Sequence, residues 1–496
     1  MKFLLDWKYA SLWIVLTVCG LPAFAQGYEI RLTINNGNEM MLLGHYFANS
    51  SMFRDDSCQL DKSGKGVFKG KEKLERGLYC VIWNKRTATG VEQRKLFDFI
   101  VGDEQKFEIT ADTTDLVNKI SSKGSKENEV FFAFQRFNMQ KGLRFQELRQ
   151  SYESAADSKK PEIRTELQAL NQERLEYLQK TIDDNQGLFV VKFFKTLIPV
   201  DSKLPDYPRD DAGNITDSTY LYRWYRAHFF DNLNIYDPEM LRTPFYEEKL
   251  MEYFGKVIPQ HPDTINLEAD KILAKAQADP AVFRCVLVTL FNFYTKSQIM
   301  VHENIWVHLA DKWYKHASWT SPDYLEKLAK EVDKRKTNLI GSYAPPMDML
   351  MVLPPDHFKA AALDTAIKND LHAGVPINDF RKSLKGKFTA ILFWDISCSH
   401  CRKTIQDLYA EYEKLKEKGL TVITVQTVNT KDAKGKWIDF VNEHQMFGWT
   451  NAWSPYSVKF RTAYDISTTP QLFLLNENEE IIGKRLTPEQ LELFLK

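Results

Sequence analysis

The chain has 496 residues, more than a single hydrophobic core usually organises, so we expect about three domains. Hydrophobic residues make up 44% and charged residues 27%, a balance typical of folded globular proteins and not of disordered ones. Lysine plus arginine and aspartate plus glutamate are equal at 66 each, so no net charge attracts the chain to nucleic acid or to an anionic membrane surface.

Residues 1–25 have the pattern of a secretory signal peptide. An apolar run extends from residue 10 to about residue 21, and the small residues Ala23 and Ala25 fit the rule for cleavage after Ala25. This run is too short to span a membrane, which takes about 20 apolar residues. Lipid attachment at Cys19 is a rival interpretation, although the residue before it is bulky where a small one is expected. We expect a periplasmic or otherwise exported protein with no spanning segment after cleavage.

Residues 26–120 have the pattern of a small antiparallel β-sandwich. Short segments of alternating apolar and polar residues follow one another and are separated by Gly, Asn and Asp. These segments are 28–34, 40–46, 66–68, 78–83, 96–101 and 106–110. Cys58 and Cys80 could pair across strands, or each could be a single buried cysteine.

Residues 121–339 read as an all-α domain. Apolar residues recur near helical spacing over 162–181, and 281–294 is nearly all apolar, which indicates a buried helix. Prolines separate the helical segments, and the polar stretch 201–219 is typical of a long loop.

Residues 340–496 alternate between strands and helices. A continuous apolar strand at 388–394 is followed by a helix at 402–418, a second buried strand at 420–427 and a helix at 436–443. Strands at 471–475 and 480–484 and a closing helix at 488–495 complete the pattern. Such alternation predicts an α/β domain.

Two cysteines, Cys398 and Cys401, stand directly after the first of these strands, where the next helix begins. Unpaired backbone N–H groups and the positive end of the helix dipole stabilise a thiolate at such a place. The spacing brings Cys401 within bonding distance of Cys398 but one turn deeper. Cys398 can therefore attack a substrate disulfide as the nucleophile, and Cys401 can resolve the mixed intermediate by forming the Cys398–Cys401 disulfide.

His400 lies between the two cysteines. Its imidazole adds hydrogen-bond donors or positive charge near the Cys398 sulfur, which would stabilise the thiolate and make the disulfide more oxidising. A zinc site at this pair would need a second pair of ligands, and the sequence has no other close cluster of Cys or His. We expect no metal and no cofactor other than the redox-active dithiol.

Several motifs together make residues 341–496 similar to the TlpA/ResA type of extracytoplasmic thioredoxins, and the cysteine segment resembles the Phe-Trp-x-x-Trp-Cys-x-x-Cys stretch of thioredoxins. They are Phe393-Trp394 ahead of Cys398-Ser399-His400-Cys401, then Gly341…Ala344-Pro345, Leu384-Lys385-Gly386-Lys387, and Tyr464-Asp465-Ile466 followed by Thr469-Pro470. The resemblance implies that Pro470 is cis and lies against Cys398, and that the Thr469 backbone faces the bound substrate. We also expect Trp394 and Ser399 to contact the substrate.

The sequence departs from this family at three places. Ser397 replaces the usual Trp before the first cysteine, Leu392 replaces the buried aspartate of thioredoxin, and Thr404 replaces a glutamate of some TlpA/ResA members. Proton transfer to Cys401 must therefore use water or another group. The two preceding domains show a weaker resemblance, to domains of unknown function in bacterial exported thiol–disulfide proteins.

The expected protein is multidomain. A signal peptide at 1–25 precedes a small antiparallel β-sandwich at 26–120, an all-α domain at 121–339 and an α/β thioredoxin fold at 340–496. The expected activity is thiol–disulfide exchange outside the cytoplasm, as a reductase of cysteine pairs in exported proteins, with an unidentified upstream dithiol as electron donor and no nucleic-acid partner. The alternatives are an oxidant or isomerase, or a partner-binding scaffold with a redox-inert thioredoxin domain.

Overall fold

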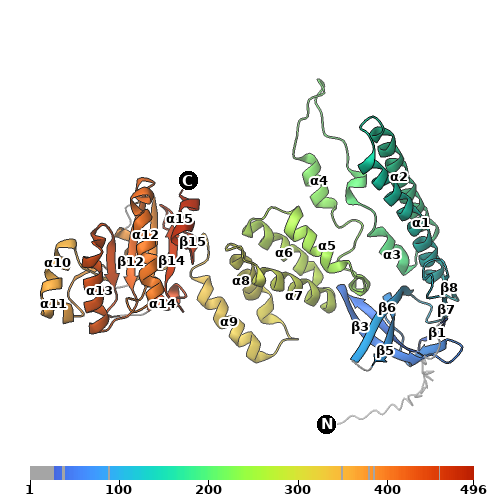
Figure 1. Ribbon diagram of the computed structural model, residues 1–496, viewed down its shortest axis with the longest axis horizontal. Coiled ribbons are helices and arrows are strands. Elements are labelled where there is room, and N and C mark those ends of the chain that lie inside the picture. Colours follow the sequence, from blue (N-terminus) through green and yellow to red (C-terminus); the bar gives the residue numbers. More distant parts are fainter. Residues whose placement is uncertain are drawn as a thin grey trace, which may run out of the picture. The chain divides into compact units, whose positions relative to one another are not determined.

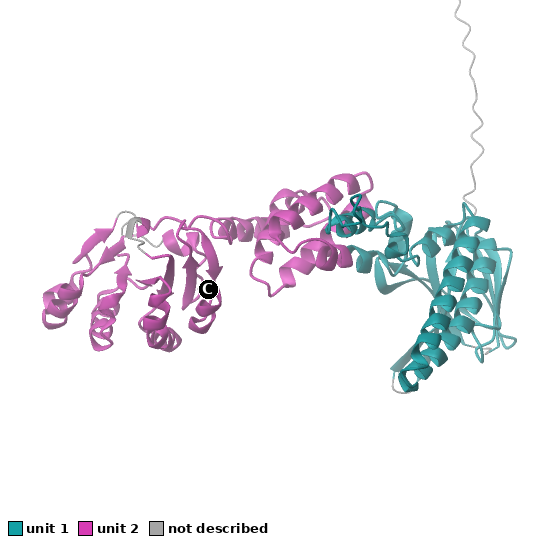
Figure 2. Ribbon diagram, turned by 90° about the horizontal axis from the view of Figure 1, so that it is seen from above, with its two compact units in different colours: residues 1–250 teal, residues 251–496 magenta. Residues whose placement is uncertain are grey.

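This computed structural model describes residues 27–35, 39–87, 90–347, 350–377, 380–383, 386–456 and 459–495. The predicted signal peptide, Cys19, Leu384 and Lys385 lie outside the described residues. The chain separates into two compact units, 1–250 and 251–496 (Figure 2), so the helices expected as one domain are divided between them. Among the described helices, none is both long and apolar enough to cross a membrane.

Two four-stranded sheets form the first part of the N-terminal unit (Figure 1). Their strands are β1 (Glu29–Ile34), β2 (Met40–Phe47), β3 (Asn49–Gln59), β4 (Lys65–Lys69), β5 (Gly77–Thr87), β6 (Gly90–Val101), β7 (Lys106–Ala111) and β8 (Ile120–Lys123). The strand orders are β4-β1-β7-β8 and β3-β2-β5-β6. The inner faces of the sheets meet in an aromatic core, in which Phe99 of β6 and Phe107 of β7 make an edge contact with ring centroids 6.1 Å apart.

The sandwich is not wholly antiparallel, which corrects the prediction from sequence. Strand β1 pairs with β7 in parallel, whereas the neighbouring pairs β1–β4 and β7–β8 are antiparallel. Strands β2 and β3 of the second sheet follow β1, β4 returns to the first sheet, and β5 and β6 of the second sheet precede β7. An alternating pattern shows which face of a strand is buried, but it carries no information on the direction of the neighbouring strand.

Helices complete the N-terminal unit. They are α1 (Lys126–Ser154), α2 (Lys160–Asp184), α3 (Phe189–Lys195), α4 (Tyr220–His228) and α5 (Tyr246–Glu252), with short 3-10 turns η1 (Val200–Lys203) and η2 (Pro238–Arg242). A buried carboxylate joins two of them, because Glu127 of α1 accepts hydrogen bonds of 2.7 Å from the backbone N–H groups of Phe189 and Val190. These groups at the start of α3 have no partner within their own helix.

The second unit combines four helices with a seven-stranded sheet. The helices α6 (Pro262–Ala276), α7 (Pro280–Lys296), α8 (His302–Lys312) and α9 (Pro322–Lys336) come first, with η3 (Tyr253–Val257) and η4 (Tyr314–His316). The sheet domain contains β9 (Leu350–Val352), α10 (Pro355–Leu363), α11 (Thr365–Asn369), β10 (Val375–Ile377), η5 (Phe380–Ser383), β11 (Phe388–Trp394), α12 (Ser399–Glu417), β12 (Leu420–Gln426), α13 (Lys431–Glu443), η6 (Met446–Gly448), β13 (Thr450–Trp453), α14 (Lys459–Ala463), β14 (Gln471–Leu475), β15 (Ile481–Lys484) and α15 (Pro488–Phe494).

Strand β11 lies inside this sheet, whose order is β10-β9-β13-β12-β11-β14-β15. It pairs in parallel with β12 and antiparallel with β14. Alternate side chains of β11 enter two different cores, Leu392 with α12, α13 and α15 on one face, and Phe393 with α14 on the other. Both faces are therefore covered, which is why this strand is continuously apolar in sequence.

Buried polar contacts attach helices α8 and α9 to the sheet domain. The ammonium group of Lys484, in β15, forms an ion pair with Glu303 of α8 and donates to the side-chain oxygen of Asn338 over 2.9 Å. Just beyond the end of α9, the side chains of Thr337 and Asn338 donate to the carbonyl oxygen of Ala463 over 2.7 and 3.1 Å. The four helices and the sheet domain therefore form one compact unit.

Candidate redox site

A tight turn carries the chain from β11 into α12 and sets the position of the cysteine pair. The carboxylate of Asp395 accepts hydrogen bonds from the backbone N–H and the hydroxyl of Ser397, over 2.8 and 2.7 Å. The carbonyl oxygen of Asp395 accepts from the N–H of Cys398 over 3.0 Å. Cys398 is consequently the residue that caps the N-terminus of α12.

Cys398 is partly exposed, and its sulfur faces the start of the helix. The Sγ atom lies 3.4 Å from the backbone nitrogen of Cys401, whose N–H it accepts. This N–H belongs to the first turn, where backbone donors lack partners in the helix and the dipole favours negative charge. The position suits a nucleophilic thiolate.

Cys401 is in a different environment, with a side chain that is 0% exposed. Burial raises the pKa of its thiol to about 11, and neighbouring Cys398 raises it further. Hydrogen bonds from the Thr469 side chain and the Asp395 backbone act in the opposite direction and stabilise the Cys401 thiolate. Cys401 is therefore a neutral thiol near pH 7 and needs help to lose its proton.

The loop before β14 reaches the pair from 71 positions further along the chain. Its Thr469–Pro470 peptide bond is cis, and the carbonyl oxygen of Thr469 lies 3.8 Å from Cys398 Sγ. The same loop is held from below by Tyr464, whose buried hydroxyl donates to the carbonyl oxygen of Pro345 over 2.7 Å. Two motifs that are far apart in sequence, at Pro345 and at Tyr464, thus meet beneath the loop.

The other predicted site residues are placed differently. His400 and Ser399 are exposed in the first turn of α12, and His400 lines a pocket together with Pro470. Trp394 is 0% exposed and packs against Phe440, with ring centroids 5.5 Å apart. The structure therefore places Trp394 in the core and not on the surface that a client would contact, because the last residue of β11 points away from the pair and beneath α12 and α13.

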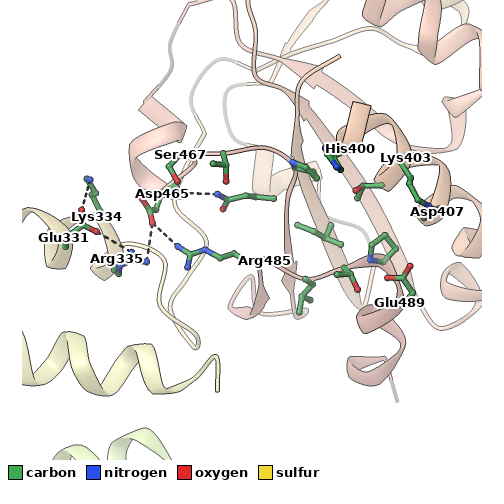
Figure 3. Close-up of a pocket in the computed structure, with 18 residues that line it drawn as sticks. Glu331, Lys334, Arg335, His400, Lys403, Asp407, Asp465, Ser467, Arg485 and Glu489 are labelled. Carbon is green, nitrogen blue, oxygen red and sulfur yellow. Dashed lines mark hydrogen bonds and ion pairs between the residues drawn. The ribbon is translucent and has the colours of Figure 1, made fainter. Parts of the chain in front are cut away.

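The pocket beside His400 and Pro470 has a volume of about 810 Å³ and contains residues that the sequence analysis missed (Figure 3). At its centre, the carboxylate of Asp465 pairs with Arg485 over 3.0 Å and with Arg335, from α9, over 3.4 Å. No sequence signal joins these two arginines, since they are 150 positions apart and meet only through the packing of α9 on the sheet domain.

Within the described ranges, no group of three His, Cys, Asp or Glu side chains could hold a metal ion. Cys58 and Cys80 in the sandwich are separate thiols in this structure, and burial raises their pKa values to about 11 and about 12. Both therefore remain protonated near neutral pH.

Comparison with known proteins finds similarity to thioredoxin-like proteins in the same segment. A family model described as thioredoxin-like matches residues 386–481. The chain is 32% identical over 129 residues to the thiol-disulfide oxidoreductase ResA of Bacillus thuringiensis and to that of Bacillus anthracis. Each match covers 23% of this chain. It spans 65% of the length of these curated relatives.

Solved structures resemble parts of the chain. A thioredoxin-like protein from Bacteroides caccae is 17% identical, with a TM-score of 0.37, over 59% of this chain and 97% of its own. The thioredoxin domain of a thiol-disulfide oxidoreductase from Bacteroides vulgatus is 23% identical, with a TM-score of 0.24, over 32% of this chain and 98% of its own.

Proposed function

We propose that this chain is an extracytoplasmic thiol–disulfide oxidoreductase that reduces disulfides of exported proteins through Cys398 and Cys401. One observation carries the proposal. An accessible sulfur at the start of α12 is backed by a buried sulfur one turn deeper, and both lie beside Thr469. An exposed nucleophile and a protected second thiol are what a two-step exchange requires.

The exchange has two steps. The Cys398 thiolate attacks one sulfur of the client disulfide, and the other client sulfur leaves as a thiolate that takes up a proton. The Cys401 thiol then loses its proton and attacks Cys398, which releases the second client sulfur and forms the Cys398–Cys401 disulfide. Two electrons pass to the client, and an upstream dithiol must return two electrons before the next cycle.

Three further observations support the location and the direction. Residues 1–25 have the pattern of a cleaved signal peptide, which favours export to an oxidising compartment. The ResA relatives carry the name thiol-disulfide oxidoreductase, in agreement with exchange chemistry. The Cys401 thiol is neutral near pH 7, so the reduced form of the pair is not stabilised as a dithiolate. A reduced form without this stabilisation gives up its electrons more readily, which favours a reductase over a strong oxidant.

Trapping experiments test the proposal directly. Cys401→Ser removes the resolving thiol, so mixed disulfides between Cys398 and client proteins should accumulate and be visible on non-reducing gels. Cys398→Ser removes the nucleophile and should trap none. Cys58→Ser, in the N-terminal unit, is the matched control and should behave as the wild type. Absence of trapped species from the Cys401→Ser protein would contradict exchange chemistry and favour a scaffold.

A further inference from the structure

The charged side chains of the pocket beside Pro470 form two opposed groups (Figure 3). One group contains residues of α9, of the loop before β14 and of the segment after β15. Its members are Glu331, Lys334 and Arg335 from α9, Asp465 from that loop and Arg485 directly after β15. We call this group the arginine wall. On the other side lie His400, Lys403, Asp407 and Glu489, from α12 and α15.

Positive charge exceeds negative charge in the arginine wall, where three cations accompany two carboxylates. Glu331 pairs with Lys334 over 3.0 Å and with Arg335 over 3.4 Å, and Asp465 pairs with both arginines. Arg335 has further partners, because its guanidinium also pairs with Glu303 over 2.8 Å. The carboxylate that pairs with Arg485, Asp465, is shared with Arg335.

Arg485 is also the arginine that an incoming group can reach. Its side chain is 47% exposed, against 21% for Arg335. Among the described residues, only Asp465 accepts a hydrogen bond from it, through one terminal nitrogen, so most of its five N–H donors are unused. A guanidinium with several unused donors in a concave site suits a carboxylate, which it can bind with two parallel hydrogen bonds.

The backbone holds this pair in place at a conformational cost. Arg485 has φ 56° and Asp465 has φ 50°, so both non-glycine residues are in the left-handed region. This region is sparsely populated by such residues, because their side chains crowd the backbone there. The Asp465 carbonyl oxygen also accepts from the side-chain amide of Gln471, next to Pro470. The position of Arg485 is thereby coupled to the loop that contacts Cys398.

We propose that this pocket binds the client polypeptide beside the cysteine being exchanged, and that Arg485 selects clients with an acidic side chain at that place. The inference rests on the proposed function, because it names the substrate class of the same site. A client strand lying on Pro470 borders the pocket, since Pro470 lines it and directly follows Thr469, whose carbonyl oxygen lies 3.8 Å from Cys398 Sγ. An Asp or Glu side chain close to the client cysteine then reaches Arg485.

The test uses the reduced full-length protein and three synthetic disulfide-bridged peptides. They are identical except that the residues flanking one cysteine are Glu, Gln or Lys. The measured quantity is the second-order rate constant for peptide reduction. The wild type should reduce the Glu peptide about tenfold faster than the Lys peptide, the scale of one charge-assisted hydrogen bond. Added salt should narrow the difference.

Variants then assign the preference to a residue. Arg485→Gln should lower the ratio of the Glu-peptide rate to the Lys-peptide rate to about 1. Arg485→Lys keeps the charge and should retain part of the preference for the Glu peptide. Lys414→Gln is the matched control. Lys414 is exposed on α12 and pairs with Glu492, outside the pocket, so the rate ratio should equal that of the wild type.

Each other result overturns part of the inference. If the wild type reduces all three peptides at the same rate, the pocket does not select an acidic client, although the proposed exchange chemistry stands. If Arg485→Gln folds and keeps the full ratio, the selecting residue is not Arg485. If the wild type reduces none of the peptides, the proposed function fails, and the inference fails with it.

Discussion

The two cysteines differ in one physical property that decides their roles, access to water. Cys398 is partly exposed and accepts the N–H of Cys401, whereas the Cys401 side chain is fully buried beneath it. Desolvation penalises the charged form of an acid, so the buried Cys401 thiol holds its proton, whereas client disulfides can reach the partly exposed Cys398 sulfur. Attack on a client should therefore be fast, and release of the client should be slow.

The release step should depend steeply on pH. The pKa of Cys401 is raised from 9.0 to about 11 by burial, so its reactive thiolate is scarce at pH 7. Below that pKa the thiolate fraction rises about tenfold for each pH unit, and the release rate should follow it. Stopped-flow measurement of the decay of a preformed mixed disulfide between pH 6.5 and 9 tests this. A release rate that levels off below pH 8 would contradict it.

The same shift affects the stability of the reduced protein. A thiol with a raised pKa in the folded state contributes stability that is fully present below the unfolded pKa of 9.0 and is lost as the pH rises through about 11. Between these values the unfolded chain has already released the proton that the folded chain retains. The stability of the reduced form should therefore decline over this range more than that of the oxidised form.

Thr469 is a candidate to assist loss of the Cys401 proton, because Leu392 and Thr404 stand where related proteins have acidic residues. Its side chain hydrogen-bonds to the Cys401 sulfur and stabilises the thiolate. Thr469→Val keeps the shape and removes this bond, which is worth about 1 kcal/mol, so release should slow by roughly fivefold. Thr462→Val, at an exposed position of α14, is the control for the same chemical change. Equal release rates in the two variants would exclude this role.

At the scale of elements, we predict that the first turn of α12 influences the redox potential of the cysteine pair. His400 occupies its second position, is exposed, and forms no hydrogen bond with any described residue. Positive charge at this place would add to the field of the helix dipole, and we expect it to stabilise the reduced form of the pair. Proline is tolerated at this place, because the backbone N–H groups of a first turn need no helical partner.

His400→Pro should consequently make the couple more reducing. The expected change is about 30 mV for each tenfold change in the exchange equilibrium. A redox titration in glutathione buffers measures it, and His400→Gln, which removes the charge but keeps the helix backbone, should shift the potential in the same direction. An unchanged potential, or a more oxidising one, would show that His400 points into solvent without effect.

The elements were predictable where apolar residues form a continuous run or a regular pattern, and were missed where they do neither. The strand expected at 388–394 matches β11, and the expected helix at 281–294 lies within α7. Strand β3 was missed, because nearly all its residues are exposed and its polar sequence shows no alternation. Its place is set by pairing with β2 along the whole edge of the sheet, which local sequence does not encode.

Part of the site could be predicted from local sequence. Cys398 and Cys401 are close in sequence and follow a recognisable strand, and Pro470 is marked by its motif. The arginine wall was not predictable, since Arg335 and Arg485 come together only when α9 docks on the sheet domain. The burial of Trp394 was likewise missed, because a motif identifies a residue but not the direction of its side chain.

At the scale of the whole molecule, one of the contacts that join the four helices to the seven-stranded sheet in the second unit is a buried charge. Lys484 is 3% exposed, and burial lowers the pKa of its ammonium group, whereas the carboxylate of Glu303 raises it. The oxygens of Asn338 are its other partners, at 2.9 and 3.1 Å. A buried cation with these partners is stable only while the helices remain docked on the sheet.

Glu303→Gln should therefore destabilise the whole unit and not only α8. The substitution leaves the Lys484 ammonium group buried without its counter-charge, which typically costs about 3 kcal/mol. Thermal unfolding followed through the tryptophans of the helices and of the sheet domain should show one transition at a lower temperature than in the wild type. The loss of stability should become smaller at alkaline pH, because Lys484 then loses its proton. Glu326→Gln is the control, because its pair with Lys330 is 68% exposed on both sides and should contribute less than about 1 kcal/mol. Two separate transitions, with the sheet domain unaffected, would show that the helices and the sheet are energetically independent.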